Sequence, residues 1–409
     1  MPKTICVVGA FDTKESEYEY VINIFVESKF SVLTVNTGVM ESSGKFKIDV
    51  DSKELAAAGG GDIEALRRNR DRGEAMKVMS KGASVIVRNL YEQGRIDGIF
   101  GMGGTGGTSL VTSAMRTLPL GIPKICVSTV ASGDTSAYVG TKDIVLIPSI
   151  VDVSGLNKIS RMIISKAAGA ICGMMKRECR GAEKEKPIIV ASMFGNTTPC
   201  VEHAKVILEK QGYEVLVFHC TGTGGRTMES LVEAGFAVGV LDITTTEWAD
   251  ELVGGVFTAG PTRLDAAAKS GVPAIVVPGC LDMVNFNAPE TVPVKFKGRR
   301  FYQHNPNVTL MRTNVEESRR LGEILAEKLN MSKGPVTVLI PLRGISMIDL
   351  EGKAFHWPEA NKALFSVLKN NLKKDIRVIE MDCDINAPEF SDSCADTLLE
   401  MMSAVSGGK

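Results

Sequence analysis

The chain has 409 residues, enough for two or three domains that each bury a hydrophobic core. It carries 47 Lys and Arg against 48 Asp and Glu, so it lacks the basic excess that is typical of nucleic-acid-binding proteins. No apolar stretch reaches the roughly 18 residues that cross a bilayer, and the first residues run into a strand without a signal-peptide pattern. We therefore expect a cytoplasmic protein that binds neither nucleic acid nor membrane.

The first half of the chain alternates short apolar runs with helix-length amphipathic stretches, a rhythm typical of parallel β-α-β units. Residues 62–94 predict two helices separated near Gly73, and the apolar spacing from Ile159 onward predicts a long helix that closes the first domain. The strands predicted in this half lie at 5–9, 31–36, 98–101, 124–129 and 143–148.

The charged segment 176–186 has no apolar periodicity and ends at Pro187, the composition of a solvated linker. The predicted domains are therefore 1–183 and 184–409. The fold class is α/β, with two Rossmann-like subdomains whose mainly parallel sheets are flanked by helices. Each half opens with a buried strand that ends in a polar turn and later carries a Gly-Thr-rich loop, which leaves a duplicated α/β unit open as an interpretation.

The second half restarts the same rhythm. Helices are predicted from Pro199, with Thr198 as the cap, and near Thr227. Residues 281–314 have few helix or strand signals, and a connection of that length predicts a functional or disordered loop. The strands predicted here lie at 188–192, 214–219, 237–241, 274–277, 336–340 and 376–381.

The nine cysteines include no C-x-x-C pair, so neither a disulfide framework nor a structural zinc site is expected. Most are interpreted as buried thiols. Cys280 follows a predicted strand and is a candidate nucleophile, but no histidine is near it in the sequence, which favours a buried thiol there too.

The glycine-rich run 101–109 (GMGGTGGTS) lies between a predicted strand and a predicted helix. Its glycines let the backbone approach an anion, while Thr108 and the first amides of the helix offer donors to phosphate oxygens. The run is neither a P-loop, because Gly107 replaces the lysine, nor a dinucleotide fingerprint, because the next strand ends in Ser128 and Thr129 without an acidic ribose partner. The alternative is a tight turn that only packs strand against helix.

Other strand ends are expected beside this run, because ligands bind at the carboxyl edge of a parallel sheet. They are residues 12–14, 37–38, and 128–129 with 133–135. Lys14 is a candidate to neutralise phosphate, and Asp12 or Asp134 to hold hydrated Mg²⁺. For Asp12 and Thr13 the alternative is a helix cap.

The second half has its own glycine loop at 219–227 (HCTGTGGRT), and polar residues follow later strands. This collection suits an anionic or polyhydroxylated substrate, with a histidine as general acid or base and Arg226, Arg263 or Arg312 as anion clamps. A structural role for each histidine, and a metal site built from the histidines with Asp242 or Asp282, are the alternatives. The candidate catalytic residues are His219, Asp242, Glu247, Asp282 and His304.

Together these segments resemble the Tm-1-like ATP-binding family (UPF0261), over essentially the whole chain. The resemblance rests on long stretches, among them 8–14, 103–108, 193–195, 241–247 and 282–286. It implies Mg-ATP in the first domain and a homodimer. It also implies that plant members continue into a barrel-like domain, so any activity that rests on that domain would here come from a separate partner protein or be absent.

The resemblance places the expected nucleotide contacts in the first domain, and the sheet-edge argument adds Ser128 and Thr129. The contacts carried over by motif are Asp12, Thr13, Lys14, Thr37, Gly38, Gly103, Gly104, Thr105, Gly106, Gly107 and Thr108.

These observations lead to an ATP-dependent enzyme whose small carboxylate- or sugar-like metabolite binds in the second domain. The rival hypothesis is a non-catalytic module in which ATP gates the binding of another protein. A third is a metabolite-binding scaffold that uses no ATP.

Overall fold

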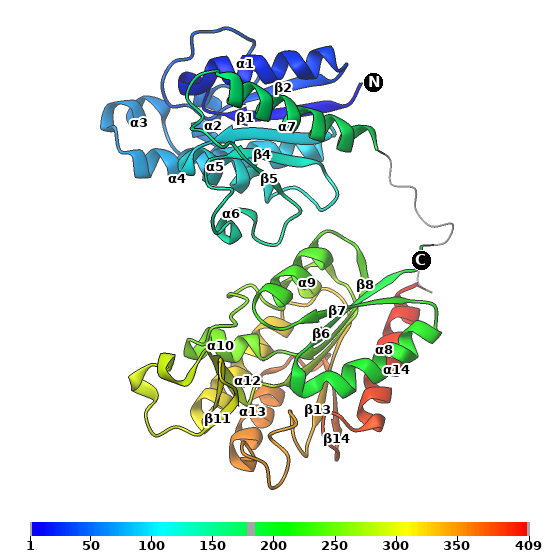
Figure 1. Ribbon diagram of the computed structural model, residues 1–409. Coiled ribbons are helices and arrows are strands. Elements are labelled where there is room, and N and C mark those ends of the chain that lie inside the picture. Colours follow the sequence, from blue (N-terminus) through cyan, green and yellow to red (C-terminus); the bar gives the residue numbers. More distant parts are fainter. Residues whose placement is uncertain (1, 178–184, 407–409) are drawn as a thin grey trace. The chain divides into compact units, whose positions relative to one another are not determined.

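The computed structural model describes residues 2–177 and 185–406 (Figure 1). The chain divides into two compact units, Met1–Gly181 and Ala182–Lys409. Both are α/β units with a parallel sheet flanked by helices, as the sequence predicts. The boundary predicted at residue 183 lies outside the described residues.

The first unit is built on a five-stranded sheet in the order β2-β1-β3-β4-β5, and all neighbouring strands are parallel. Each strand lies where the apolar runs predict one, because a strand buried on both faces of a parallel sheet has a continuous apolar sequence. The strands are β1 Thr4–Gly9, β2 Ser31–Asn36, β3 Gly98–Gly103, β4 Lys124–Ser128 and β5 Val145–Pro148.

Helices cover both faces of this sheet. Ile5 and Val7 of β1 pack against α1 and α7, whereas the alternate residues Cys6 and Val8 pack with α2, α4 and α5 on the other face. The predicted break in the 62–94 region lies slightly before Gly73, since Asp71 caps α4. The helices are α1 Phe11–Glu27, α2 Ser52–Ala58, α3 Ile63–Asn69, α4 Arg72–Glu92, α5 Thr105–Met115, α6 Ser136–Val139 and α7 Lys158–Lys176.

The second unit has a six-stranded parallel sheet in the order β14-β13-β9-β8-β6-β7. Its strands are β6 Ile188–Met193, β7 Glu214–His219, β8 Ala237–Thr244, β9 Ala274–Gly279, β13 Val336–Pro341 and β14 Arg377–Met381. Its helices are α8 Thr198–Lys210, α9 Thr223–Glu233, α10 Glu247–Val253, α11 Asp265–Ser270, α12 Val315–Leu329, α13 Pro358–Asn371 and α14 Pro388–Ser406.

The two units share one topology. Counted from the first strand of each unit, both sheets run in the order 2-1-3-4-5, and the second unit adds a sixth strand at the end. This shared order supports the interpretation of a duplicated unit. In each sheet the strand order reverses between the first and third strands, and this position is called the switch point. In open α/β folds, ligands bind beside the carboxyl ends of the strands at the switch point.

Three expectations about local structure were wrong. Residues 281–314 contain an antiparallel sheet, β10-β12-β11, formed by β10 Met283–Phe286, β12 Val308–Arg312 and β11 Phe301–Asn305, with two short 3-10 turns, Pro289–Thr291 and Val294–Phe296. These strands are short, and the wholly exposed β11 has no apolar alternation to reveal it. Thr197, in the 3-10 turn Gly195–Thr197, is the N-cap residue of α8 in place of Thr198, and α9 begins at Thr223, inside the predicted glycine loop.

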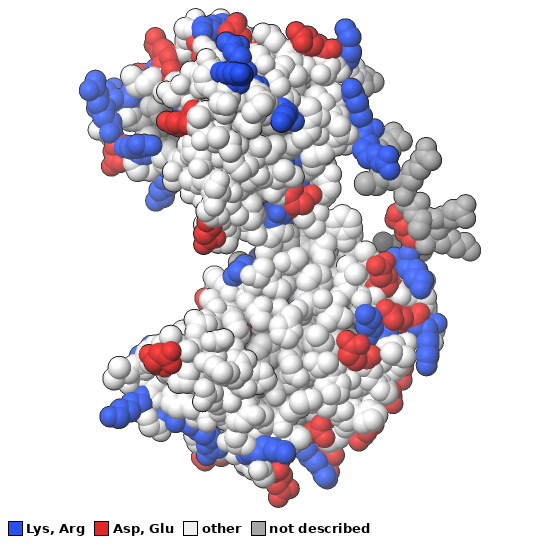
Figure 2. All heavy atoms as spheres, in the orientation of Figure 1, with Lys and Arg blue, Asp and Glu red and all other residues white. Residues whose placement is uncertain are grey.

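Charge is mixed over the surface. On the face drawn in Figure 2, Lys and Arg alternate with Asp and Glu over both units. None of the helices in the described ranges combines the length and the apolar character needed to cross a bilayer.

Helices α2 and α4 touch through their backbones, which makes Gly82 a sensitive position. A Cβ on Gly82 would lie 2.0 Å from the carbonyl oxygen of Leu55. Although alanine favours a helix interior by about 1 kcal/mol over glycine, this overlap should dominate, and we expect Gly82→Ala to lower the free energy of unfolding by about 2 kcal/mol. Urea unfolding followed by circular dichroism measures the change.

The matched control is Gly169→Ala in α7, where an added Cβ meets nothing within 4 Å. This variant should raise the free energy of unfolding by up to about 1 kcal/mol. Stabilisation by both substitutions would show that α2 and α4 are free to move apart.

Candidate functional site

The N-terminus of α5 opens at the switch point between β1 and β3. Strand β3 ends at Gly103 and α5 begins at Thr105, so the predicted glycine loop reduces to one residue, Gly104, which is the N-cap and has no side chain to cap the helix. An added Cβ on Gly104, Gly106 or Gly107 would meet no atom closer than 3.6 Å. The amides of Thr105, Gly106 and Gly107 have no acceptor among the described residues, and they carry the positive end of the helix dipole.

Other glycines of the run serve packing. A Cβ on Gly103 would lie 2.9 Å from the Cα of Gly107, so glycine is needed for the strand to meet the helix. The Thr108 hydroxyl lies 2.7 Å from Ser128 Oγ and donates to the Gly103 carbonyl, and both hydroxyl side chains are fully buried. Thr108 and Ser128 thus tie β4 to the turn and present no open donor.

Asp12 is the unusual side chain at this edge. Its Oδ2 accepts a hydrogen bond of 2.9 Å from the Met40 amide, while its buried Oδ1 has no partner among the described residues. Gly38 makes room for it, because a Cβ there would lie 2.4 Å from the Asp12 carboxyl carbon. The helix-cap alternative for Asp12 fails, because the N-cap of α1 is Ala10 and no side chain caps that helix.

The remaining predicted nucleotide contacts lie at the same edge of the sheet. Thr13 is exposed, and Lys14 has non-helical dihedral angles (φ -132°, ψ 28°) that kink α1. Thr37 is buried after β2, and its amide donates to the Gly9 carbonyl. Thr129 follows β4 and lies beside Gly104.

A cavity of about 370 Å³ lies at the carboxyl ends of β4 and β5. Its lining is rich in hydroxyl groups and includes one carboxylate. The lining residues are Ser128, Thr129, Ser132, Pro148, Ser149, Ile150, Val151 and Asp152. The cavity and the open N-terminus of α5 therefore lie on one edge of one sheet.

The predicted magnesium ligands differ in their surroundings. Asp134 is exposed, and its Oδ1 accepts from the Ser136 amide, which with the Ser136 hydroxyl lowers the pKa of Asp134. Within residues 2–177 and 185–406, no three His, Cys, Asp or Glu side chains are grouped to hold a metal ion. Because Mg²⁺ commonly uses only one or two carboxylates together with phosphate oxygens, Asp12 has the better-suited oxygen.

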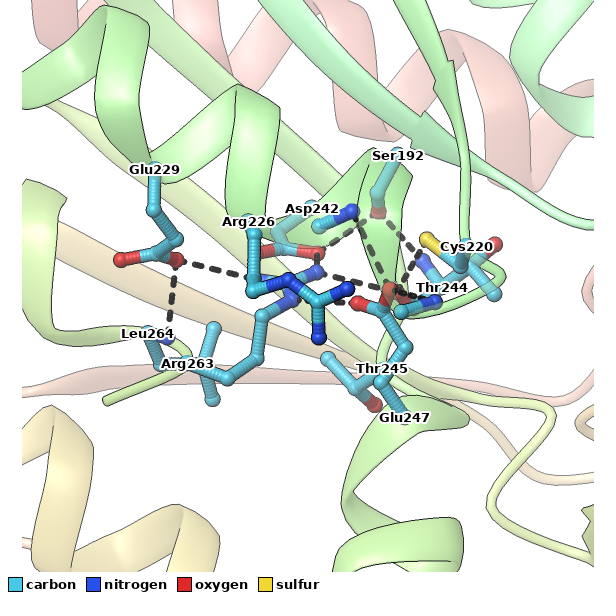
Figure 3. A network of polar contacts seen from close by, with 12 residues as sticks. Ser192, Cys220, Arg226, Glu229, Asp242, Thr244, Thr245, Glu247, Arg263 and Leu264 are labelled. Atoms are coloured by element: carbon cyan, nitrogen blue, oxygen red, sulfur yellow. Dashed lines mark hydrogen bonds and ion pairs between the residues drawn. The ribbon is translucent and has the colours of Figure 1, made fainter. Parts of the chain in front are cut away.

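In the second unit, Arg263 is the centre of a buried ionic network (Figure 3). Its side chain is 1% exposed and forms two hydrogen bonds to Asp242, of 2.6 and 2.7 Å, and one of 2.7 Å to Glu247. Glu229 completes the set at 3.2 Å. Burial alone would lower the pKa of Arg263, but the three carboxylates raise it well above its usual value.

Glu247 fills the N-terminus of α9. Its Oε1 accepts hydrogen bonds of 2.8 and 3.1 Å from the amides of Gly222 and Gly225, and a Cβ on Gly225 would lie 2.0 Å from Oε2. The second glycine loop therefore already binds an anion, which is a carboxylate of the same chain. Asp242, Glu247 and Arg263, predicted to be catalytic or clamping residues, instead form the structural core of this region.

Asp282 is likewise buried. Its Oδ2 accepts from the Ser346 hydroxyl at 2.7 Å, whereas its Oδ1 is without a partner among the described residues. Burial, with a further contribution from Asp349, raises the pKa of Asp282 to about 7. Arg312 is also buried and binds Asp349 at 3.2 Å, so it is not an open anion clamp.

Cys280 fits the buried-thiol alternative. It is fully buried, and burial raises the pKa of its thiol well above the usual value. Neither property suits a nucleophile that must meet a substrate as a thiolate.

His219 and His304 line one cavity of about 310 Å³, although they are far apart in the sequence. His219 ends β7, and His304 lies on β11. The sequence missed Asn196, Phe194 and Phe257, which line the same cavity. The polar turn after β6 was a visible signal for the first two, but the position of Phe257 depends on tertiary packing.

Family comparisons agree with this two-unit organisation. The model of the Uncharacterised protein family (UPF0261) N-terminal domain matches residues 3–180, and that of its C-terminal domain matches residues 186–402. A UPF0261 protein from Clostridium tetani is 49% identical over 403 residues, covering 98% of this chain and 100% of that protein. The tomato (Solanum lycopersicum) ToMV resistance protein Tm-1(GCR237) is 40% identical, covering 98% of this chain and 56% of that protein.

Solved structures are more distant. The UDP-N-acetylglucosamine 2-epimerase from Rickettsia bellii matches with a TM-score of 0.25 and 13% identity, over 67% of this chain and 78% of that one. A similarity this low says nothing about the function of the chain.

The raised pKa of Asp282 predicts a pH dependence of stability. Between about pH 4 and about pH 7 the folded protein holds a proton on Asp282 that the unfolded chain has released. The free energy of unfolding should therefore fall progressively as the pH rises over this range, and the loss should be complete above about pH 7. Asp282→Asn keeps a neutral side chain of the same shape. Relative to wild type, its free energy of unfolding should therefore increase between pH 5 and pH 8, as measured by urea unfolding.

Asp375→Asn, at an exposed position, is the control for replacing an aspartate by asparagine and is measured at the same two pH values. An Asp282→Asn effect of equal size at both pH values would show that Asp282 is already ionised in the folded protein.

Proposed function

The chain belongs to the uncharacterised protein family UPF0261, and from this premise we propose that its first unit binds Mg-ATP and that the protein is an ATP-dependent enzyme. In this proposal a small-molecule substrate binds in the second unit, in the cavity lined by His219 and His304. The observation that carries the nucleotide part is the open N-terminus of α5 at the switch point, on the edge that also holds the unpartnered oxygen of Asp12.

The contrast between α5 and α9 supports a phosphate site on α5. The two helices begin with similar sequences, TGGT in α5 and TGGR in α9. At the start of α9, Glu247 binds the amides of Gly222 and Gly225. At the start of α5, no protein acceptor in the described ranges binds the amides of Thr105, Gly106 or Gly107. An open helix N-terminus built from glycines suits a phosphate group.

Magnesium fits beside this site through Asp12. The buried Asp12 Oδ1 lacks a hydrogen bond, and an unsatisfied carboxylate oxygen is a good ligand for a hard cation. Lys14, two residues further on, supplies positive charge at the same end of β1. Bound Mg-ATP would supply a phosphoryl group for transfer, while Asp12, Lys14 and α5 would hold and orient it.

The substrate site is proposed on different grounds. The imidazoles of His219 and His304 make no side-chain hydrogen bond within the described residues and face one cavity, so they are available to exchange protons with a bound molecule.

Turnover separates this enzyme from a nucleotide-gated binding module, which would bind ATP without releasing product. A homodimer and a separate barrel-domain partner belong to the same proposal, and sedimentation analysis tests the dimer.

Gly106→Val tests the phosphate site. The added Cβ would lie 3.6 Å from Arg72 and 3.7 Å from Met76, which is ordinary contact, so the fold should persist while the side chain covers the amides of α5. We expect ATP affinity to fall at least tenfold, about 1.4 kcal/mol, in isothermal titration with Mg²⁺. Phosphate release measured on the same samples reports turnover.

Gly169→Val, at an exposed position of α7 where a Cβ meets nothing within 4 Å, is the matched control and should bind as wild type does. Unchanged ATP affinity in Gly106→Val would place the phosphates away from α5.

Asp12→Asn tests the metal ligand. The amide can still accept from Met40 but loses the negative charge that attracts Mg²⁺. Titrations with and without Mg²⁺ should show that wild type binds ATP more tightly with the metal and that this difference disappears in the variant. Asp134→Asn, at the other predicted ligand, should keep the difference; the reverse pattern would move the metal to Asp134.

A further inference from the structure

The cavity lined by His219 and His304 lies at the carboxyl edge of the second sheet. Phe194 and Asn196 follow β6, His219 ends β7, and the antiparallel sheet supplies the opposite wall through His304 and Leu310. Its volume of about 310 Å³ is within the range of small-molecule sites, about 300 to 1,000 Å³. The lining indicates which class of molecule it accepts.

The walls of the cavity are mainly apolar. Phe194 and Phe257 pack edge to face, with ring centroids 6.3 Å apart, and Val308 and Leu310 complete the surface. Behind them lies a cluster of buried apolar residues that includes Met283 and Phe355. A polyhydroxylated molecule would leave hydroxyl groups without partners against these walls, and each would carry a desolvation cost.

Three polar side chains of the lining lack adequate protein partners. Asn196 is 9% exposed, its Nδ2 contacts only the thioether sulfur of Met283 at 3.8 Å, and no hydrogen bond to its Oδ1 exists among the described residues. The ring nitrogens of His219 and His304 are likewise without hydrogen bonds there. The Asn196 amide and the two exposed imidazoles are therefore open to hydrogen bonds with a bound molecule.

His219 is held in place by stacking. Its imidazole lies 5.2 Å from the Phe194 ring with an angle of 31° between the planes. Both His219 and His304 are exposed, so their ring nitrogens are accessible to a molecule in the cavity. Two imidazoles and one carboxamide can together bind the two oxygens of a single carboxylate.

The charge of the lining excludes heavily charged ligands. The residues that line the cavity, all within the described part of the chain, include no Asp, Glu, Lys or Arg. A phosphate group would have no arginine or lysine to balance its two charges, whereas the two oxygens of one carboxylate can accept hydrogen bonds from imidazole and carboxamide N–H groups. We therefore propose that this cavity binds a monocarboxylate with an aromatic or branched apolar body. The proposal rests on the proposed function only in taking the cavity to be the substrate site.

The test uses the whole 409-residue chain without nucleotide. Phenylacetate and isovalerate are the monocarboxylate probes, and glucose and glucose 6-phosphate represent polyhydroxylated and phosphorylated compounds. Saturation-transfer NMR and isothermal titration should detect binding of the two monocarboxylates and not of the two sugars. ATP titration of the same sample tests the first unit separately, so a failure there would count against the proposed function alone.

Two substitutions locate the binding. His304→Ala removes one charge-assisted hydrogen bond and should weaken phenylacetate binding about tenfold. Gln303→Ala, at the preceding exposed position of β11 and outside the lining, is the control and should leave it unchanged. Gly195→Leu should abolish binding with an unchanged melting temperature, because a Cβ there meets nothing within 4 Å and the longer side chain would fill the cavity.

Monocarboxylate binding that is lost in His304→Ala and Gly195→Leu but kept in Gln303→Ala supports the proposal. Preferential binding of glucose or glucose 6-phosphate would overturn it while leaving the cavity as a substrate site. Binding that both substitutions leave intact, or no binding by any of the four probes, would also overturn it.

Discussion

The buried Arg263 network is the constraint on which the second unit depends. One guanidinium joins β8 through Asp242, α10 through Glu247 and α9 through Glu229. Removing one partner from such a network is costly because it leaves an uncompensated charge away from water. These elements are therefore fixed relative to one another, and with them the end of β7, where His219 stands beside the cavity.

The same network explains a difference between the glycine-rich starts of α5 and α9, which is whether a carboxylate of the chain binds their amides. The dipole and unpaired amides at the start of α9 need an anion, and Glu247 provides one from within the chain because Arg263 holds its carboxylate in place. The start of α5 has the same amides but no carboxylate of its own bound to them within the described residues. Glycine content alone therefore does not define a phosphate site, since the nearby side chains decide whether the position is open.

The strands of the two parallel sheets could be predicted from the sequence, whereas the contacts of the candidate site residues could be predicted only in part. Buried parallel strands are continuous apolar runs, so all eleven strands of the two main sheets were predicted. The antiparallel strands were missed because they are only four or five residues long and the exposed β11 shows no apolar alternation. Which carboxylates meet Arg263 could not be predicted, because Asp242, Glu247 and Glu229 are separated from it by 21, 16 and 34 positions and only the fold brings them together.

The two parallel sheets thus share one strand order, but the side chains at their carboxyl edges differ in polarity and charge. At the first sheet, hydroxyl groups, Asp12, Lys14 and a helix N-terminus gather after the strands, and all of these suit phosphate and a metal ion. At the second sheet Asp242, Glu247 and Glu229 bind Arg263, and the cavity at the edge is lined by two aromatic rings, two imidazoles, two carboxamides, one hydroxyl and aliphatic side chains. Since the strand order is shared, the difference lies in the residues that follow each strand, where α/β folds acquire their specificity. These two sets of residues are the basis for proposing a nucleotide site at the first edge and a monocarboxylate site at the second.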